Sequence, residues 1–322
     1  MLNVLKRFVN VGRPTALYFY DFLFISRILP FIMDADVVQI EQQSSGGLLI
    51  PFMKMVLKKP IVMDCHDVFQ ALRVKHTSVF RRILELFLEK LAYKKADLLL
   101  TVSKIEKDFL ISMGFESSNI AIVPNGVDTK SFSKSSNIEE LREKYQTNGY
   151  QVVVFVGNLD YYPNREAVEV LSSVIAPTVS NKIGNVKFFI VGKTRSDFKS
   201  SGLFFTGFVE NVSDILSISD VAVAPLFHGS GTRLKILEYF SCGLPVVSTS
   251  LGAEGLDVQD GVNILIEDDL ERFAARLTEV LADTRLSNAL GSAAKDVTAT
   301  KYDWKNIAKD LDGVLNSILM EK

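Results

Sequence analysis

The segment Gly229–Glu238 (GSGTRLKILE) carries residue types that bind phosphate groups. We expect a helix to begin near Thr232, and a helix N-terminus exposes unpaired backbone N–H groups and the positive end of the dipole. The preceding glycines let a phosphate approach those groups closely. Arg233 and Lys235 would put positive charge in the first turn, where cations are unfavourable for the helix itself. A bound diphosphate removes this conflict, because arginine and lysine both bind phosphate oxygens strongly.

Glu238 extends this segment from phosphate binding to nucleotide binding. It lies three residues beyond Lys235, on the same side of the predicted helix. A carboxylate there can accept two hydrogen bonds from a ribose diol, as acidic residues do in dinucleotide sites. The residues alone leave one alternative open, which is a solvated helix start with an ordinary Lys–Glu pair.

A second candidate group is Asp64–Asp67 (DCHD), which follows a predicted buried strand. Residues at the carboxyl ends of parallel strands line the crevice where such sheets bind ligands. His66 and Asp67 are therefore candidate catalytic residues. The competing interpretation is structural, since a lone histidine at a strand end commonly has no chemical role.

The elements that must position these residues alternate along the chain. In the first half we predict strands at Asp36–Gln42, Pro60–Asp64, Leu98–Val102 and Ile120–Val123. The helices between them are Leu48–Leu57, Thr77–Lys95 and Lys104–Met113. The long helix Thr77–Lys95 is amphipathic, with a charged face of Arg81, Arg82, Glu85, Glu89 and Lys90. Alternation of this kind predicts a parallel, doubly wound sheet.

A second alternating run starts at Gln151, after a polar stretch at Thr129–Gly149. Its predicted strands are Val152–Val156, Lys187–Val191, Leu203–Phe205, Val221–Pro225, Pro245–Ser248 and Asn263–Ile266. Its predicted helices include Asn164–Ser173, Val212–Ser217, Thr232–Cys242 and Asp269–Asp283, and a last helix lies around Trp304–Leu319. We therefore predict an α/β protein with two doubly wound halves.

Length and composition agree with a two-domain globular protein. The 322 residues favour two domains, and 48% hydrophobic with 23% charged residues is typical of soluble proteins. A net charge of −2 gives no electrostatic footprint for nucleic acid. Cys65 and Cys242 match no metal-site spacing and predict a reducing, cytoplasmic location. The hydrophobic stretch Ala16–Met33 contains charges and a proline, so it fits a membrane surface or the core better than a spanning helix.

The stretch Pro225–Gly252 (PLFHGSGTRLKILEYFSCGLPVVSTSLG) resembles the donor-site signature of glycosyltransferase family 4, the retaining group 1 enzymes of GT-B architecture. Further segments fall in the family's order: Asn125–Asp128 (NGVD), Val152–Asn158 (VVVFVGN) and Phe205–Val209 (FTGFV). The resemblance covers Asp36 to the C-terminus. It implies two Rossmann-like domains facing a central cleft.

The resemblance also implies a division of the chain. Residues 1–128 would form an acceptor-side domain, residues 129–150 a connection, and residues 151–302 the nucleotide-sugar-binding domain. Residues 303–322 would form a C-terminal helix that packs back toward the N-terminal domain. Family members usually begin with a strand and a Gly-rich loop, and we find no clear version before Asp36. The first domain is therefore expected to be shortened.

Donor-binding residues follow from the resemblance position by position. Glu238 matches the second acid of the family's E-x7-E pattern, which binds the donor ribose, whereas the first acid is replaced by Ser230. Backbone groups of Gly231 and Thr232 would lie near the sugar and phosphates. Phe208 and Val209 would flank the nucleobase, although core packing is an equally simple role for Phe208.

The loop after the first donor-domain strand departs from the family. Gly157 fits a close approach of the diphosphate. The family often has basic residues where this chain has Asn158 and Asn164. Arg233 and Lys235 would supply the missing positive charge from the other side, and would stabilise the leaving phosphate as catalytic residues. His66 matches the family's active-site histidine, with Asp67 beside it.

The implied reaction moves a sugar from a nucleotide-diphosphate sugar to an acceptor hydroxyl, with retention of configuration. The enzyme would be a metal-independent hexosyltransferase without a cofactor, because the positioned charge of Arg233 and Lys235 can replace a metal ion at the leaving phosphate. A UDP- or GDP-sugar is the expected donor, and a glycan or lipid-linked molecule the expected acceptor. Glycan assembly in the cytoplasm, peripherally on the inner face of the membrane, would be the setting.

Two alternatives remain open at this stage. The first is a non-catalytic or partner-dependent module that binds a nucleotide sugar, which a shortened first domain favours. The second is a sugar-nucleotide epimerase or hydrolase of the same fold, which would need an acid–base set that we do not find beyond His66. A Rossmann dehydrogenase fits less well, because no strand is followed by G-x-G-x-x-G.

Overall fold

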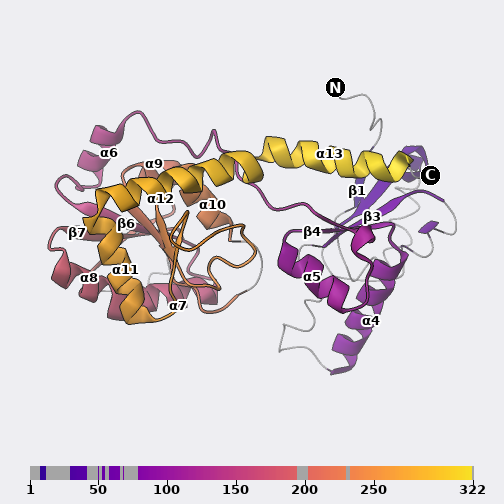
Figure 1. Cartoon of the computed structure of the whole chain (residues 1–322), viewed down its shortest axis with the longest axis horizontal. Coiled ribbons are helices and arrows are strands. Elements are labelled where there is room, and N and C mark those ends of the chain that lie inside the picture. Colours follow the sequence, from indigo (N-terminus) through magenta and orange to yellow (C-terminus); the bar gives the residue numbers. More distant parts are fainter. Residues whose placement is uncertain are drawn as a thin grey trace. The chain divides into compact units, whose positions relative to one another are not determined.

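The computed structural model describes residues 8–11, 30–41, 50, 53–54, 58–65, 68, 79–193, 202–229 and 233–320. These residues form two compact units, each built on a parallel β-sheet flanked by helices (Figure 1). The first unit comprises the described residues up to Pro124 and from Ile307 onward, and the second comprises those within Asn125–Asn306. The predicted α/β class is confirmed.

The sheet of the first unit follows the order of the chain. Its strands are β1 (Phe8–Val11), β2 (Val37–Ile40), β3 (Ile61–Cys65), β4 (Leu98–Thr101) and β5 (Ile120–Ile122), and each pairs in parallel with the next. The order therefore never reverses among the described strands of this sheet. Strands β2 and β4 are buried along their whole length, as expected for a parallel sheet covered on both faces.

Strand β1 corrects one expectation. We found no clear strand before Asp36, yet Phe8–Val11 pairs in parallel with Val37–Ile40. Its pairing with β2 is a long-range contact, which a local sequence pattern does not show. The first unit is thus less reduced than the sequence indicated.

Helices cover both faces of the first sheet. Helix α4 (Val79–Lys95) and helix α5 (Lys104–Ser112) share one apolar cluster with Val38, Ile61 and other strand residues. On the other face Leu315 of helix α13 (Trp304–Met320) packs with Val37 and Leu100. Residues 307–320 of α13 thus complete the core of the first unit.

The charged face predicted for α4 is correct at one described side chain and wrong at another. Lys90 is exposed as predicted, whereas Glu89 is buried at 4% exposure and accepts a hydrogen bond from Tyr93 Oη at 2.6 Å. The side chains of Arg81, Arg82 and Glu85 lie outside the described part of the chain. The helix also exposes the apolar side chains of Val79, Ile83 and Phe87, which are 74%, 61% and 63% exposed.

The sheet of the second unit reverses its strand order. Its six strands are β6 (Gln151–Val156), β7 (Val186–Val191), β8 (Leu203–Gly207), β9 (Val221–Ala224), β10 (Val246–Ser248) and β11 (Leu265–Ile266). Their order is β11-β10-β9-β6-β7-β8, with all neighbours parallel. The chain therefore winds outward from β6 in one direction and from β9 in the other. Such a reversal is the point where doubly wound sheets bind ligands.

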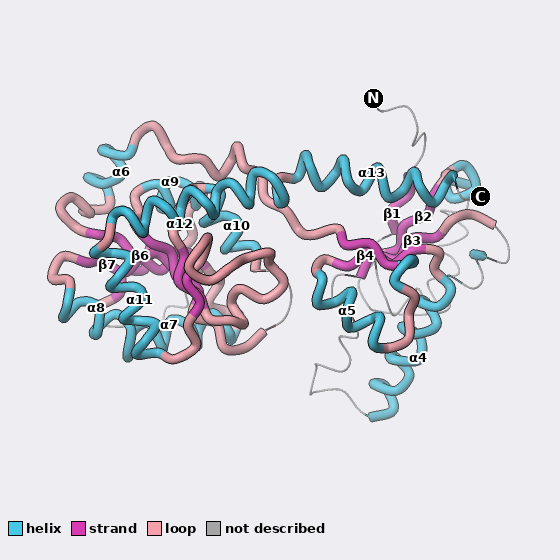
Figure 2. Tube along the Cα trace, in the orientation of Figure 1, coloured by secondary structure: helices cyan, strands magenta, loops and turns pink. Residues whose placement is uncertain are grey.

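Helices of the second unit lie on both faces of this sheet (Figure 2). One face packs against α7 (Tyr162–Val170), α8 (Ala176–Lys182) and α11 (Leu270–Ala282). The other packs against α9 (Val212–Ser217) and α10 (Leu234–Ser241). Helix α12 (Thr284–Val297) gives Leu290 to the first face and Ala294 to the second. The predicted strands and helices of this half are confirmed, but we did not predict α8 or α12.

Residues of the expected connection are part of the second unit. Helix α6 (Ile138–Lys144) lies in this stretch, and Phe132 and Tyr145 pack against the core that includes β6 and α10. Val127 pairs with Asp303 in an isolated bridge, and its backbone N–H donates to the Tyr302 carbonyl at 2.8 Å. The described residues of this stretch are thus tied to the second unit by apolar and backbone contacts.

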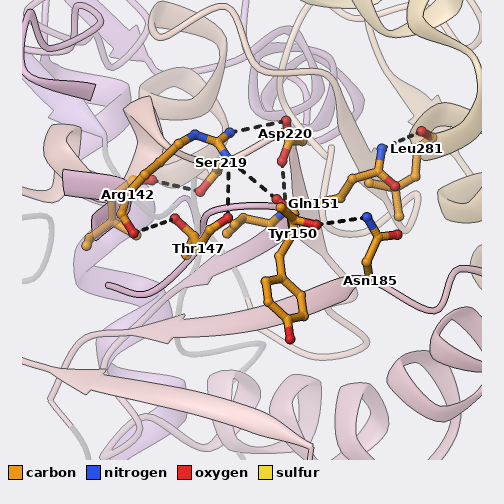
Figure 3. Close-up of polar contacts among 11 residues, drawn as sticks. Arg142, Thr147, Tyr150, Gln151, Asn185, Ser219, Asp220 and Leu281 are labelled. Carbon is orange, nitrogen blue, oxygen red and sulfur yellow. Dashed lines mark hydrogen bonds and ion pairs between the residues drawn. The ribbon is translucent and has the colours of Figure 1, made fainter. Parts of the chain in front are cut away.

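A polar network closes the amino end of the second sheet (Figure 3). Asp220 accepts a hydrogen bond from the Val152 N–H at 2.7 Å and lies 3.7 Å from the Arg142 guanidinium. Gln151 donates to the Leu281 carbonyl at 2.6 Å, and Asn185 donates to the Gly149 carbonyl at 2.9 Å. Each of these side chains satisfies a backbone group or a charge at a strand entrance, so the network supports the fold.

Candidate functional site

The carboxyl ends of β6 and β9 lie side by side where the strand order of the second sheet reverses. The loop Gly157–Tyr161 follows β6, and the loop Pro225–Gly229 follows β9. Helix α7 then continues from the first loop on one face, whereas α10 lies on the other face. Five of the described residues that we predicted to bind a ligand, namely Gly157, Asn158, Arg233, Lys235 and Glu238, belong to these loops or to the start of α10.

Glycine backbones line the ends of three strands here. The Gly157 N–H donates to the Val191 carbonyl at 2.8 Å, and the Gly192 N–H donates to the Gly207 carbonyl at 3.0 Å. Gly192 has φ +135°, and a Cβ atom added there would lie 2.3 Å from the Gly157 carbonyl oxygen. The strand ends therefore come together closely because these positions carry no side chains.

Gly157 itself also has no room for a side chain. A Cβ atom added there would lie 2.7 Å from the Asn164 Cγ atom. The Asn164 side chain is buried, and its Nδ2 donates to the Asn158 carbonyl at 2.9 Å. The loop after β6 is thus fixed by an amide that packs directly on its glycine.

Lys235 reaches Asn164 from α10. Its ammonium donates to Asn164 Oδ1 at 2.8 Å and lies 4.2 Å from the centroid of the Phe155 ring. Burial and, to a smaller extent, the charge of Arg233 lower the pKa of Lys235 to about 7, against the opposing effect of Glu238. An anion that binds beside the Lys235 ammonium would therefore stabilise its charged form.

The strand end beneath Lys235 is anchored from α10. Tyr239 is fully buried, and its hydroxyl accepts a hydrogen bond from the Val156 N–H at 2.7 Å. Val156 is the last residue of β6, directly before Gly157. The helix that supplies Lys235 and Glu238 is therefore locked to the strand that presents the glycine loop.

Arg233 stands before α10 and corrects the predicted helix start. The helix begins at Leu234, and Arg233 has the non-helical angles φ −83° and ψ 76°. Its side chain is 7% exposed, and burial lowers its pKa while Tyr161 and Glu254 raise it. A Cβ atom added at Gly229 would lie 3.2 Å from Arg233 Nη1. The guanidinium thus lies beside the glycine loop after β9.

Glu238 lies within the electrostatic reach of Lys235, as the spacing predicted. Burial raises the pKa of its carboxyl, and Lys235 lowers it. The side chain remains half-buried. A desolvated carboxylate beside a lysine is well placed to accept hydrogen bonds from a ligand.

Phe208 and Val209 follow β8 and behave differently. Phe208 is 82% exposed, so the alternative role in core packing is wrong. Val209 packs partly against the apolar cluster of β6 and α10. An exposed phenylalanine next to a strand end offers a flat surface on which a base can stack.

Several predicted residues lie outside the described part of the chain. They are His66 and Asp67 after β3, and Ser230, Gly231 and Thr232 between Gly229 and Arg233. Their roles remain predictions. In the described residues no cluster of three or more His, Cys, Asp or Glu side chains could hold a metal ion. Cys65 and Cys242 are both free thiols, and both are buried.

The structure adds residues that the sequence reasoning did not assign. Asn164 contacts Gly157, Asn158 and Lys235 through one side chain. Its place as a substitute for a basic residue was a signal, but its partner on α10 lies 71 residues away in sequence. Tyr239 and Gly192 are further supporting residues, recognisable only from their contacts.

Two family models together match most of the chain. Residues 3–131 match Glycosyltransferase Family 4, and residues 150–283 match Glycosyl transferases group 1. The chain belongs to glycosyltransferase family 4. The resemblance carried by Pro225–Gly252 is thereby confirmed, and the protein is a group 1 glycosyltransferase.

Known relatives span nearly the whole chain. An uncharacterized glycosyltransferase of Methanocaldococcus jannaschii is 23% identical over 310 residues, which are 89% of this chain and 76% of that protein. The phosphatidyl-myo-inositol mannosyltransferase of Mycobacterium tuberculosis is 24% identical over 299 residues, or 88% of this chain and 74% of that protein. These relatives support a role in glycan or glycolipid synthesis.

A solved structure confirms the architecture. Anabaena HepE in complex with UDP superimposes with a TM-score of 0.76 at 17% identity, covering 92% of this chain and 82% of that chain. At this identity the comparison concerns the fold. This glycosyltransferase thus has the two Rossmann-like domains of the GT-B architecture, as predicted.

Proposed function

We propose that this glycosyltransferase moves a sugar from a nucleotide-diphosphate sugar to an acceptor hydroxyl with retention of configuration. The observation that carries this proposal is the Lys235 ammonium bonded to Asn164, the residue that packs on Gly157, at the strand reversal of the second sheet. A partly desolvated cation beside a glycine-lined strand end suits a phosphate group.

The described residues support a nucleotide orientation. The diphosphate would lie between the Gly157 loop and Arg233, with Lys235 and Arg233 on its oxygens. Glu238 would accept hydrogen bonds from the ribose. Phe208 would stack on the base, and Val209 would meet the base edge with its backbone. A UDP- or GDP-sugar fits this arrangement, and HepE, the structural neighbour, was solved with UDP.

The chemistry follows from where charge develops. Cleavage of the donor leaves negative charge on the β-phosphate, and Arg233 and Lys235 would stabilise it without a metal ion or cofactor. The departing phosphate would take the proton from the acceptor hydroxyl on the same face of the sugar. Ser230, Gly231 and Thr232 would lie close to the sugar and phosphates. The transferred group would be a hexose.

The acceptor side rests on the first unit. His66 and Asp67 follow β3 directly and would face the transferred sugar. A glycan or lipid-linked acceptor is proposed because the mycobacterial relative is named for the lipid phosphatidyl-myo-inositol. Substituting His66 with alanine should leave nucleotide binding unchanged and reduce transfer.

Membrane location is a further part of the proposal. In the described part of the chain no helix is long and apolar enough to cross a bilayer. Helix α4 exposes Val79, Ile83 and Phe87, and Lys90 and Lys94 are exposed on the same side of the helix. Apolar side chains next to lysines suit an anionic lipid surface on the cytoplasmic leaflet. Co-sedimentation with vesicles containing anionic lipid should fall for Phe87→Asp and not for Lys182→Asp on α8.

A donor screen tests the central claim. Thermal shift with UDP, GDP and ADP and with their sugars should raise Tm for one base, because a ligand that binds the folded state stabilises it. Release of the nucleoside diphosphate in the presence of lipid acceptors then separates a transferase from a binding module. Absence of any shift across all three bases would refute the donor site.

A further inference from the structure

We propose that Asn164 is a positioning residue for Lys235, holding the lysine of α10 at the carboxyl end of β6, where Asn164 itself packs on Gly157, so that the lysine serves the donor phosphates. The inference rests on the proposed function. It concerns how the chain places a cation at a loop that has neutral residues, Asn158 and Asn164, near the glycine.

Asn164 touches every part of this arrangement. Its Oδ1 accepts from the Lys235 ammonium at 2.8 Å, and its Nδ2 donates to the Asn158 carbonyl at 2.9 Å. Its Cγ lies 2.7 Å from the position that a Cβ atom of residue 157 would occupy, which is too close for a side chain there. Both ends of the amide are thus used, and the side chain is 8% exposed. One residue therefore fixes the loop and the cation together.

Lys235 reaches Asn164 across the end of the sheet. Helix α10 packs on the face formed by Val154, Ala222 and their neighbours, whereas Phe155 and α7 belong to the opposite face. The ammonium nevertheless lies 4.2 Å from the Phe155 ring centroid. A long side chain that crosses a strand end needs a partner on the far face to hold it there. Asn164 is that partner.

The choice of a neutral partner has a consequence for charge. The charged groups acting on Lys235 are Arg233 and Glu238 on its own segment, while β6 and α7 present the neutral Phe155 and Asn164. An aspartate at position 164 would satisfy the lysine without a ligand. The amide orients the ammonium and leaves its charge for an incoming anion.

Proton uptake is the accompanying signature. The pKa of Lys235 is about 7 in the free protein because of burial. A phosphate beside the ammonium raises that pKa, so binding near pH 8 should be accompanied by uptake of most of a proton, or roughly 0.5–1 per site. A lysine that only supports the fold would not take up a proton when the nucleotide binds.

A double-mutant cycle with UDP as the probe tests the inference. The variants are Asn164→Ala, Lys235→Met and the double variant, with titration calorimetry at pH 8 in two buffers of different ionisation enthalpy. GDP replaces UDP if the donor screen selects it. Losing a hydrogen bond to a charged group costs about tenfold in affinity, so we expect Asn164→Ala to weaken UDP roughly tenfold and Lys235→Met by more. The double variant should bind no more weakly than Lys235→Met, within about twofold.

The control is Asn185→Ala, which truncates an exposed asparagine at the amino end of the same sheet. It should bind UDP like the wild type and take up the same number of protons. If the effects of Asn164→Ala and Lys235→Met multiply, or if Asn164→Ala binds normally, the positioning role is overturned while the donor site stands. If Lys235→Met itself binds UDP and GDP like the wild type, or if neither nucleotide binds the wild type, both proposals fail.

Discussion

The two ends of the second sheet use polar residues in opposite ways. At the amino end, Asp220 accepts from the Val152 N–H at 2.7 Å, and Gln151 and Asn185 each donate to a carbonyl (Figure 3). At the carboxyl end, glycines stand at the strand ends, and the cations Arg233 and Lys235 lie beside them. The first set completes the fold, and the second is the set that we propose to bind the donor phosphates.

The two ends differ in what surrounds a buried charged group. Burial raises the pKa of Asp220, and the hydrogen bond from the Val152 backbone and the charge of Arg142 partly offset this effect. The carboxylate thus has its partners within the protein. Lys235 has a neutral amide and an aromatic ring as its partners, and burial lowers its pKa to about 7. Substitutions at the carboxyl end should therefore change ligand binding, and those at the amino end should change stability.

Arg233→Met should have the largest effect. The methionine side chain fills the buried position with apolar atoms and removes the charge that would stabilise the leaving phosphate. Removing one preorganised donor of this kind costs about 10²–10³ in kcat. Nucleotide release with the donor found by thermal shift measures it. Arg233→Lys retains the charge and should recover part of the rate, whereas equal rates for both variants would argue against an electrostatic role.

Gly157→Ala should harm both stability and binding. Its methyl group would stand 2.7 Å from Asn164 Cγ, so the amide that fixes the loop must move. Overpacking of this kind costs about 1–3 kcal/mol of unfolding free energy. Chemical denaturation and UDP titration measure the two effects. Gly184→Ala is the matched control, since a Cβ atom there meets nothing within 4 Å.

Asp220→Ala should destabilise the protein and leave nucleotide binding unchanged. The substitution removes the hydrogen-bond acceptor of the Val152 N–H and the carboxylate beside Arg142. The expected loss is about 1–3 kcal/mol of unfolding free energy. Denaturation with and without UDP measures both quantities. A weakened UDP affinity at equal fraction folded would break the contrast between the two ends.

Asp220→Asn sharpens the same test through pH. The folded-state pKa of Asp220 is raised, so the stability from its protonated form is present below the ordinary carboxyl pKa and is lost as pH rises through the raised value. An asparagine can still accept from the Val152 N–H and carries no buried charge. Its stability relative to the wild type should therefore increase as pH rises through that range.

Phe208→Ala should have the smallest effect, and on binding alone. The ring is 82% exposed, so its removal should change the unfolding free energy by less than about 0.5 kcal/mol. Loss of a stacking surface should weaken UDP by roughly fivefold to tenfold. Thermal melts and titration measure the two. Phe204→Ala removes a ring that is 47% exposed on the preceding strand β8, and serves as a comparison that should leave UDP binding intact.

Periodicity predicted most of the second unit well because its strands are buried runs between turn residues. Strand β9 and helix α9 fall within one residue of their predicted bounds. Helix α10 begins two residues later than predicted, since Arg233 turns away from helical geometry into a buried place. Strand β1 escaped prediction because what identifies it is its pairing with β2, a contact between residues far apart in the chain.

Local pattern and residue type were enough to predict the two parallel α/β halves and to mark Gly229–Glu238 as a candidate phosphate site. Neither could predict which partner holds Lys235 or that Glu89 of α4 is buried. The physical reason is that burial and side-chain contacts join residues far apart in the chain. Asn164 and Lys235 meet at 2.8 Å only because β6 and β9 are neighbours at the strand reversal.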